Sequence, residues 1–194
     1  MNGRDAEGAD HCQNYGFICI GGMNMAFFFS LMEKTPRIVT LNQPIRFAGL
    51  SVRTDMKRIY RDASGLGRKY ARIKKACSIP ALKTPWAFVA YSRDFNEAAG
   101  SWEYIMGDVV TGFDALPEGL KGYEIPAGVW AVFTIRPRFR FMWGAEIGRM
   151  KRFIFNHWLP GSGYRSTGGD FEYHDDRSTG KAASIDLYVG IEKK

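Results

Sequence analysis

Hydrophobic residues recur at two different spacings along this chain, and each spacing predicts a different element. Between Met56 and Cys77 the apolar residues recur at steps of three and four, which is typical of an amphipathic helix. The same spacing between Trp143 and Trp158 predicts a second helix, which we expect to end before Pro160. The segments around these helices contain short runs of aromatic and β-branched residues, which predict strands.

The predicted elements occur in the same order twice. A strand, a helix and two further strands form each copy, and both leading strands are interrupted by proline, at Asn42-Gln43-Pro44 and at Pro126-Ala127-Gly128. The predicted strands lie at 37–52, 86–91, 101–110, 123–135, 171–174 and 184–191. We therefore predict an α+β fold: a duplicated strand–helix–strand–strand repeat with an antiparallel sheet, two helices and a central groove between the halves.

Residues 1–36 differ from the rest of the chain in composition. The run from Tyr15 to Met32 contains no charged residue, which approaches the length of a membrane-spanning helix, but glycine and asparagine interrupt it. The acidic residues before it are atypical of a secretory signal, which begins with a basic segment. We interpret residues 1–36 as an N-terminal extension and residues 37–194 as the folded domain, and we expect no membrane partner.

Composition narrows the class of protein further. A hydrophobic content of 45% and a charged content of 24% are typical of a soluble globular chain. The three cysteines have no paired spacing, which favours a reducing, cytoplasmic setting over a disulfide framework. The three histidines are scattered and no zinc motif or phosphate-binding loop occurs, so we expect neither a metal nor another cofactor.

The net charge of +7 raises the question of nucleic-acid binding. Most of the basic residues of the first predicted helix lie on its polar face, between Lys57 and Lys75. Such a face could contact phosphates, but it is more often simply solvated.

One acidic residue stands in an aromatic strand. Side chains alternate across a strand, so Glu172 shares a face with Asp170 and His174, while Phe171 and Tyr173 point to the other side. Two interpretations remain open from the spacing alone. Glu172 is either an acid in the apolar wall of a pocket or an ordinary residue on a solvated strand face.

Five stretches in this order resemble the GyrI-like, or AraC-type effector-binding, domain family. They are Phe47-Ala48-Gly49-Leu50-Ser51-Val52-Arg53-Thr54, Trp102-Glu103-Tyr104-Ile105-Met106-Gly107, Ile125-Pro126-Ala127-Gly128-Val129-Trp130-Ala131-Val132-Phe133, Trp158-Leu159-Pro160-Gly161-Ser162-Gly163-Tyr164 and Asp170-Phe171-Glu172. The resemblance covers about residues 37–194. It implies two pseudo-symmetric repeats with a ligand pocket where they meet, and such pockets take bulky, often cationic, aromatic compounds beside a buried acid.

By this resemblance the pocket acid is Glu172. The strand faces add five aromatic candidates for the pocket walls, which are Tyr91, Trp102, Tyr104, Trp130 and Phe133. His174 stands where the family commonly has tyrosine, and a histidine beside the acid would reduce a preference for cations when it is protonated. An organic cation would compensate the buried carboxylate, and each aromatic face would add about 0.5–2 kcal/mol through cation–π contact.

We therefore expect a stand-alone protein that binds a small amphipathic or cationic ligand. No segment before Arg37 has the composition of a helix-turn-helix, so we expect no direct DNA binding. Three alternatives remain open. They are a hydrolase of small electrophiles that uses Glu172 as a base, a protein-binding module of the gyrase-inhibitor type, and a nucleic-acid module on the basic helix.

Overall fold

The structure is a computed structural model that describes residues 33–180 and 182–194. In these residues eight strands form one antiparallel sheet. The uncharged run that we assigned to an N-terminal extension lies outside the described residues. The strands are β1 (Arg37–Leu41), β2 (Ile45–Asp55), β3 (Phe88–Asn96), β4 (Ser101–Val109), β5 (Lys121–Ile125), β6 (Gly128–Ile135), β7 (Tyr164–His174) and β8 (Ile185–Lys193).

Two helical segments accompany the sheet. Helix α1 spans Ile59–Ala76, and α2 spans Trp143–Phe153 and continues through a π-helical stretch, Ile154–Trp158, into the short α3, Leu159–Gly161. The second segment therefore runs past the end that we predicted before Pro160. Proline is accepted there because it lies in the first turn of α3, where a backbone N–H is not needed for the helical hydrogen bonds.

The order of strands in the sheet is symmetric about its centre. The order is β1-β6-β8-β7-β3-β4-β2-β5, so the two halves meet where β7 pairs with β3. Each half contains the three strands of one repeat and one short edge strand. One half has β2, β3 and β4 with β5 at the edge, and the other has β6, β7 and β8 with β1 at the edge. The predicted α+β fold with a duplicated strand–helix–strand–strand repeat is confirmed.

Both interrupted strands were predicted wrongly as single strands. β1 pairs with β6, whereas β2 pairs with β4 and β5, so the break at residues 42–44 carries the chain from one half of the sheet to the other. The break at residues 126–127 carries it back, from β5 to β6. Alternation along a segment shows that it is extended but not which strand it pairs with, and this is why the crossings were missed.

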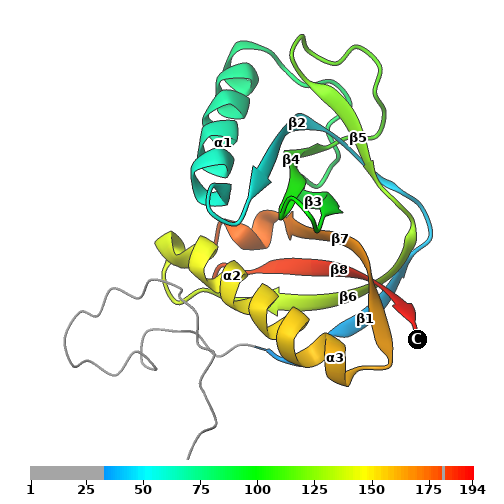
Figure 1. Cartoon of the computed structure of the whole chain (residues 1–194). Coiled ribbons are helices and arrows are strands. Elements are labelled where there is room, and N and C mark those ends of the chain that lie inside the picture. Colours follow the sequence, from blue (N-terminus) through cyan, green and yellow to red (C-terminus); the bar gives the residue numbers. More distant parts are fainter. Residues whose placement is uncertain (1–32, 181) are drawn as a thin grey trace, which may run out of the picture.

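Both helices lie on one side of the sheet, α1 over the half with β2 and β4 and α2 over the half with β6 and β8 (Figure 1). A hydrophobic cluster lies beneath each helix. A third cluster lies on the opposite face and contains residues from β1 and β6 as well as from β2 and β5. Because strands near both edges contribute to one cluster, the sheet curls around it. Side chains of the sheet therefore face either the helices or this enclosed core.

Candidate functional site at the centre of the sheet

Glu172 lies at the centre of the sheet. Five residue pairs join β3 to β7, and Ala90 opposite Glu172 is the middle pair. Asp170, which forms an ion pair with Lys151 of α2, shares the face of Glu172, so this face is the one covered by the helices. The side chain of Glu172 is 11% exposed. The solvated-face alternative is therefore wrong, and Glu172 is a buried acid.

A lysine from α2 reaches the carboxylates of β7. Its Nζ lies 2.5 Å from Oδ1 of Asp170. Burial alone would lower the pKa of the Lys151 ammonium, but the negative charges of Asp170 and Glu172 raise it above its ordinary value. Burial raises the pKa of Asp170, and Lys151 opposes that rise. Lys151 therefore remains a cation beside Asp170 at neutral pH, and it brings its own positive charge into the site.

Glu172 itself has a different neighbour. Nε2 of His174 lies 3.4 Å from Oε2 of Glu172, and the two groups form an ion pair when the imidazole is protonated. The imidazole packs edge-on against Phe88 of β3, with ring centroids 5.8 Å apart, and against Trp143 at the start of α2, with centroids 6.3 Å apart. Aromatic rings from the sheet and from α2 therefore fix the histidine beside the acid.

Two of the predicted aromatic residues share this side of the sheet. Tyr104 and Trp102 are buried side chains of β4 in the cluster beneath α1. Burial raises the pKa of the Tyr104 phenol well above its ordinary value, and the charges of Glu172 and Asp170 raise it further. Tyr104 is therefore a neutral phenol at neutral pH, in the electrostatic field of both carboxylates.

Tyr60 of α1 lies between the two helices. A β-carbon added at Gly144 of α2 would lie 3.1 Å from Cε1 of Tyr60, and one added at Gly148 would lie 3.1 Å from its hydroxyl oxygen. The glycines therefore let the tyrosine lie close against α2. Tyr60 is 65% exposed, so this contact lies at the surface. The hydroxyl of Tyr60 is also close enough to Lys151 to raise the pKa of the ammonium slightly.

Two other predicted site residues lie on the face of the sheet opposite to that of Glu172, and a third shares its face. Tyr91 and Trp130 lie in the cluster on the opposite face of the sheet, where each packs edge-on against Phe171. Phe133 lies on the helix side but is fully buried beneath α2, edge-on to Trp158. The register of the strands thus separates Tyr91 and Trp130 from Glu172, which the sequence alone could not show, whereas Phe133 and Glu172 both pair with Leu187 and share one face.

Sequence reasoning missed Lys151, Tyr60 and Trp143. A signal for Lys151 was present, because it follows Ile147 by four residues and precedes Ile154 by three, which places a cation on the apolar face of the helix. A lysine at such a position either extends past the core or pairs with a buried acid. No comparable signal exists for Tyr60, since its role depends on how close α1 and α2 lie.

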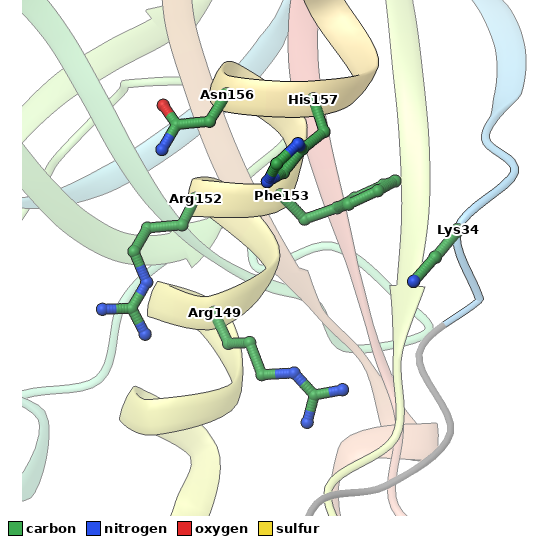
Figure 2. A pocket seen from close by; sticks show the side chains of 6 residues that line it. All are labelled: Lys34, Arg149, Arg152, Phe153, Asn156 and His157. Atoms are coloured by element: carbon green, nitrogen blue, oxygen red, sulfur yellow. The ribbon is translucent and has the colours of Figure 1, made fainter. Parts of the chain in front are cut away.

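A second feature is a surface pocket beside α2 (Figure 2). Its volume is about 390 Å³, and five of its six lining side chains come from α2 and the π-helical stretch, while Lys34 comes from the segment before β1. The lining residues are Lys34, Arg149, Arg152, Phe153, Asn156 and His157. None of them carries a carboxylate, so this basic pocket is unsuited to a cation, and it shares no residue with the Glu172 site.

The described residues contain neither a metal-binding cluster nor a membrane-spanning helix. No group of three or more His, Cys, Asp or Glu side chains there is arranged to hold a metal ion. None of the helices in that part of the chain combines the length and the apolar character that crossing a bilayer requires.

Curated relatives of this chain are transcriptional regulators. The chain is 30% identical to the transcriptional regulator BrlR of Pseudomonas aeruginosa over 107 residues, which cover 53% of this chain and 38% of BrlR. It is 27% identical to YobU of Bacillus subtilis, a putative transcriptional regulator protein, over 158 residues, which cover 76% of this chain and 92% of YobU. The chain thus spans well under half of BrlR and most of YobU.

A solved structure has the same fold. The structure of SAV2435 bound to tetraphenylphosphonium superposes with a TM-score of 0.62 over 81% of this chain and 93% of that one, at 8% identity. The model of the GyrI-like small molecule binding domain matches residues 34–192. The duplicated fold, the relatives and this match agree, and the chain belongs to the family of GyrI-like small molecule binding domains.

Proposed function

We propose that this chain binds a bulky organic cation on the helix side of the sheet, with Glu172 as the compensating negative charge. The burial of Glu172 at the centre of the sheet, beneath both helices, is the observation that carries the proposal. A buried carboxylate is costly unless a positive charge or hydrogen bonds compensate it. A ligand that brings such a charge recovers part of that cost on binding.

The charges around Glu172 favour a cation over an anion. Lys151 offsets the charge of Asp170, and the near neighbour of Glu172 is His174, whose imidazole is neutral unless protonated. Glu172 is therefore the carboxylate of the pair that has no permanent cation as its near neighbour. An anion would meet the charge of this carboxylate in a poorly solvated site, whereas a cation would neutralise it.

Aromatic groups near the acid would contact the rest of such a ligand. Tyr104 and Trp102 lie on the same face of the sheet, and Phe88 and Trp143 hold the histidine. Cation–π contact with each ring would contribute about 0.5–2 kcal/mol, depending on how well water is excluded. Flat rings accept many shapes, so we expect modest selectivity among bulky cations.

We propose that Lys151 competes with the ligand for the field of Glu172, because it is paired with the neighbouring Asp170. Its side chain is 27% exposed, so it extends from solvent to the carboxylates and can withdraw along that path. We expect an incoming cation to enter beside Tyr60 and to shift the ammonium of Lys151 away from Glu172, while Lys151 stays paired with Asp170. The lysine would then act as a tethered competitor that lowers affinity and excludes weakly bound cations.

SAV2435, whose structure contains tetraphenylphosphonium, supports the choice of this ion as the first probe. The relatives BrlR and YobU support a regulatory role for the binding event. We propose that the chain senses its ligand and passes the signal to another protein.

Substitution of Glu172 by glutamine tests the proposal. Glu172→Gln keeps the shape and removes the charge, so we expect the dissociation constant for tetraphenylphosphonium, measured by titration calorimetry, to rise at least about tenfold. The matched control is Glu103→Gln, which changes the net charge equally at a strand glutamate that pairs with Arg93 on the opposite face. Equal affinities of the two variants and the wild type would refute the role of Glu172, provided that thermal unfolding shows both variants folded.

A further inference from the structure

We propose a second small-molecule site on the opposite face of the sheet from Glu172, which takes a flat, uncharged aromatic compound carrying a carbonyl oxygen. The site is a pocket of about 390 Å³ between the turn that joins β5 to β6 and the irregular part of β7. Its volume is within the range of small-molecule sites. The residues that carry the argument are Tyr91, Gly128, Trp130, Thr167 and Gly169, all of which line the pocket.

A buried hydrogen-bond donor lies at this pocket without a partner. Trp130 is 3% exposed, and its indole N–H has no hydrogen-bond acceptor among the residues that the structure describes. The nitrogen is next to the pocket wall, because a β-carbon at Gly128 would lie 3.9 Å from it. Buried donors in proteins are nearly always paired. A ligand carbonyl that enters beside Gly128 would supply the missing acceptor.

The far wall of the pocket is shaped by an irregularity in β7. The pairing of β7 with β8 shifts between Ser166 and Asp170, which places Thr167 and Gly169 in a bulge. A β-carbon at Gly169 would lie 3.2 Å from the Tyr91 hydroxyl, and one at Gly190 would lie 2.3 Å from Oγ1 of Thr167. The two glycines therefore make room for these two hydroxyl groups at the pocket. Bulges commonly redirect side chains in this way beside binding sites.

The charges and rings at the pocket select the class of ligand. Glu192 is the charged residue of its lining, and Arg165 neutralises it at 3.0 Å, so neither a cation nor an anion finds a free counter-charge there. Trp130 and Tyr91 are both fixed by edge-on packing against Phe171, with centroid distances of 4.9 and 6.4 Å. Rigid rings, a buried indole N–H without a partner and two hydroxyl groups suit a planar aromatic molecule that carries a carbonyl acceptor.

The test compares two neutral bicyclic probes on the full chain. Coumarin carries a lactone carbonyl, and naphthalene has nearly the same shape without it. Trp130→Phe keeps an aromatic ring and removes the N–H, so we expect it to weaken coumarin binding about fivefold, as for the loss of one hydrogen bond, and to leave naphthalene binding unchanged. Ala127→Phe, at an exposed turn residue that lines the pocket, should block both probes without perturbing the core.

An NMR measurement locates the contact. The chain has five tryptophans, and the indole N–H signal that is missing in Trp130→Phe should be the one that coumarin shifts in the wild type.

Saturating tetraphenylphosphonium should leave the coumarin affinity unchanged, because the two sites lie on opposite faces. The inference is overturned if Trp130→Phe binds coumarin like the wild type, if Ala127→Phe still binds both probes, if another indole responds, or if the two ligands compete. Loss of tetraphenylphosphonium binding alone would count against the Glu172 proposal only.

Discussion

At the residue scale, the chemistry of the Glu172 site depends on which charges each buried group meets. Asp170 and Glu172 stand two residues apart on one face of β7, yet Asp170 pairs with Lys151 and Glu172 lies against His174. Asp170 thus has a permanent cation beside it, whereas Glu172 has an imidazole. The cation site that we propose follows from this difference.

Removal of the internal cation should strengthen ligand binding. Lys151→Met keeps the aliphatic part of the side chain and removes the ammonium that competes with the ligand for the field of Glu172, so we expect tetraphenylphosphonium to bind about threefold to tenfold more tightly. Lys75→Met, at an exposed lysine in the last turn of α1, is the control for the change in net charge. Titration calorimetry measures both. Weaker binding by Lys151→Met would mean that the lysine supports the site rather than competes for it.

A second residue-scale prediction concerns acid stability. The hydrogen bonds that Asp175 accepts from Arg177, first from the side chain and then from the backbone, hold the pKa of the Asp175 carboxyl below its usual range. The folded state therefore keeps this group ionised at pH values where the unfolded chain takes up a proton. Its contribution to stability is present above the ordinary pKa and is lost as the pH falls through the lowered one.

We expect Asp175→Asn to lower the free energy of unfolding near neutral pH, and the deficit relative to the wild type to shrink between about pH 5 and about pH 2. Urea unfolding at each pH measures it, with Asp114→Asn, at an exposed connector residue, as the control. A deficit that stays constant over this range would contradict the assignment to ionisation.

At the scale of elements, close approach of two strands fixes the half of the sheet beneath α1. Gly49 of β2 pairs with Gly107 of β4, and a β-carbon at Gly107 would lie within 2.1 Å of the carbonyl oxygen of Ala48. Both glycines are required because backbone atoms, which cannot rotate away, fill the space where a side chain would start. The elements of this half are thus held by backbone contact as well as by the hydrophobic cluster beneath α1.

The same substitution should therefore have opposite effects at two glycines. Gly107→Ala should lower the free energy of unfolding by about 3 kcal/mol or more, because the strands must separate. Gly65→Ala, in the middle of α1 with no atom within 4 Å of the added carbon, should raise it by about 0.5–1 kcal/mol through helix propensity. Urea midpoints of the two variants decide the matter. Equal effects would show that strand contact at Gly107 is not tight.

The order of the elements followed from the sequence, but their pairing and part of their extent did not. The helical spacing predicted α1 and α2 well, and extended runs indicated every strand but missed the first seven residues of β7 and the last five of β3. Pro44 and Pro126 marked the breaks. No local pattern indicated that β1 and β2 lie in different halves of the sheet, because strand pairing depends on contacts between residues distant in sequence. For the same reason, the sequence predicted only part of the composition of the Glu172 site. Glu172, Asp170 and His174 share one strand, so alternation alone placed them together, whereas Tyr91 and Trp130 were assigned to the wrong face.

At the scale of the whole molecule, duplication places two buried acids, Asp170 and Glu172, where the two halves meet. The sheet has a helix-covered face with charged groups at its centre and an enclosed face with aromatic residues, and we assign a separate ligand class to each. Resemblance to the GyrI-like family predicted the fold and drew attention to Glu172, whose role as the pocket acid stays a proposal. The internal lysine, the tyrosine between the helices and the unpartnered indole N–H come from the three-dimensional arrangement of this chain.

The comparison of tetraphenylphosphonium with tetraphenylborate tests the central claim most directly, because the two ions share a shape and differ in the sign of their charge. The net charge of the chain is +7, so non-specific attraction would favour the borate. A site organised around Glu172 predicts at least about tenfold tighter binding of the phosphonium by the wild type, and a preference reduced to about threefold or less in Glu172→Gln. Equal or tighter binding of the borate by the wild type would contradict it.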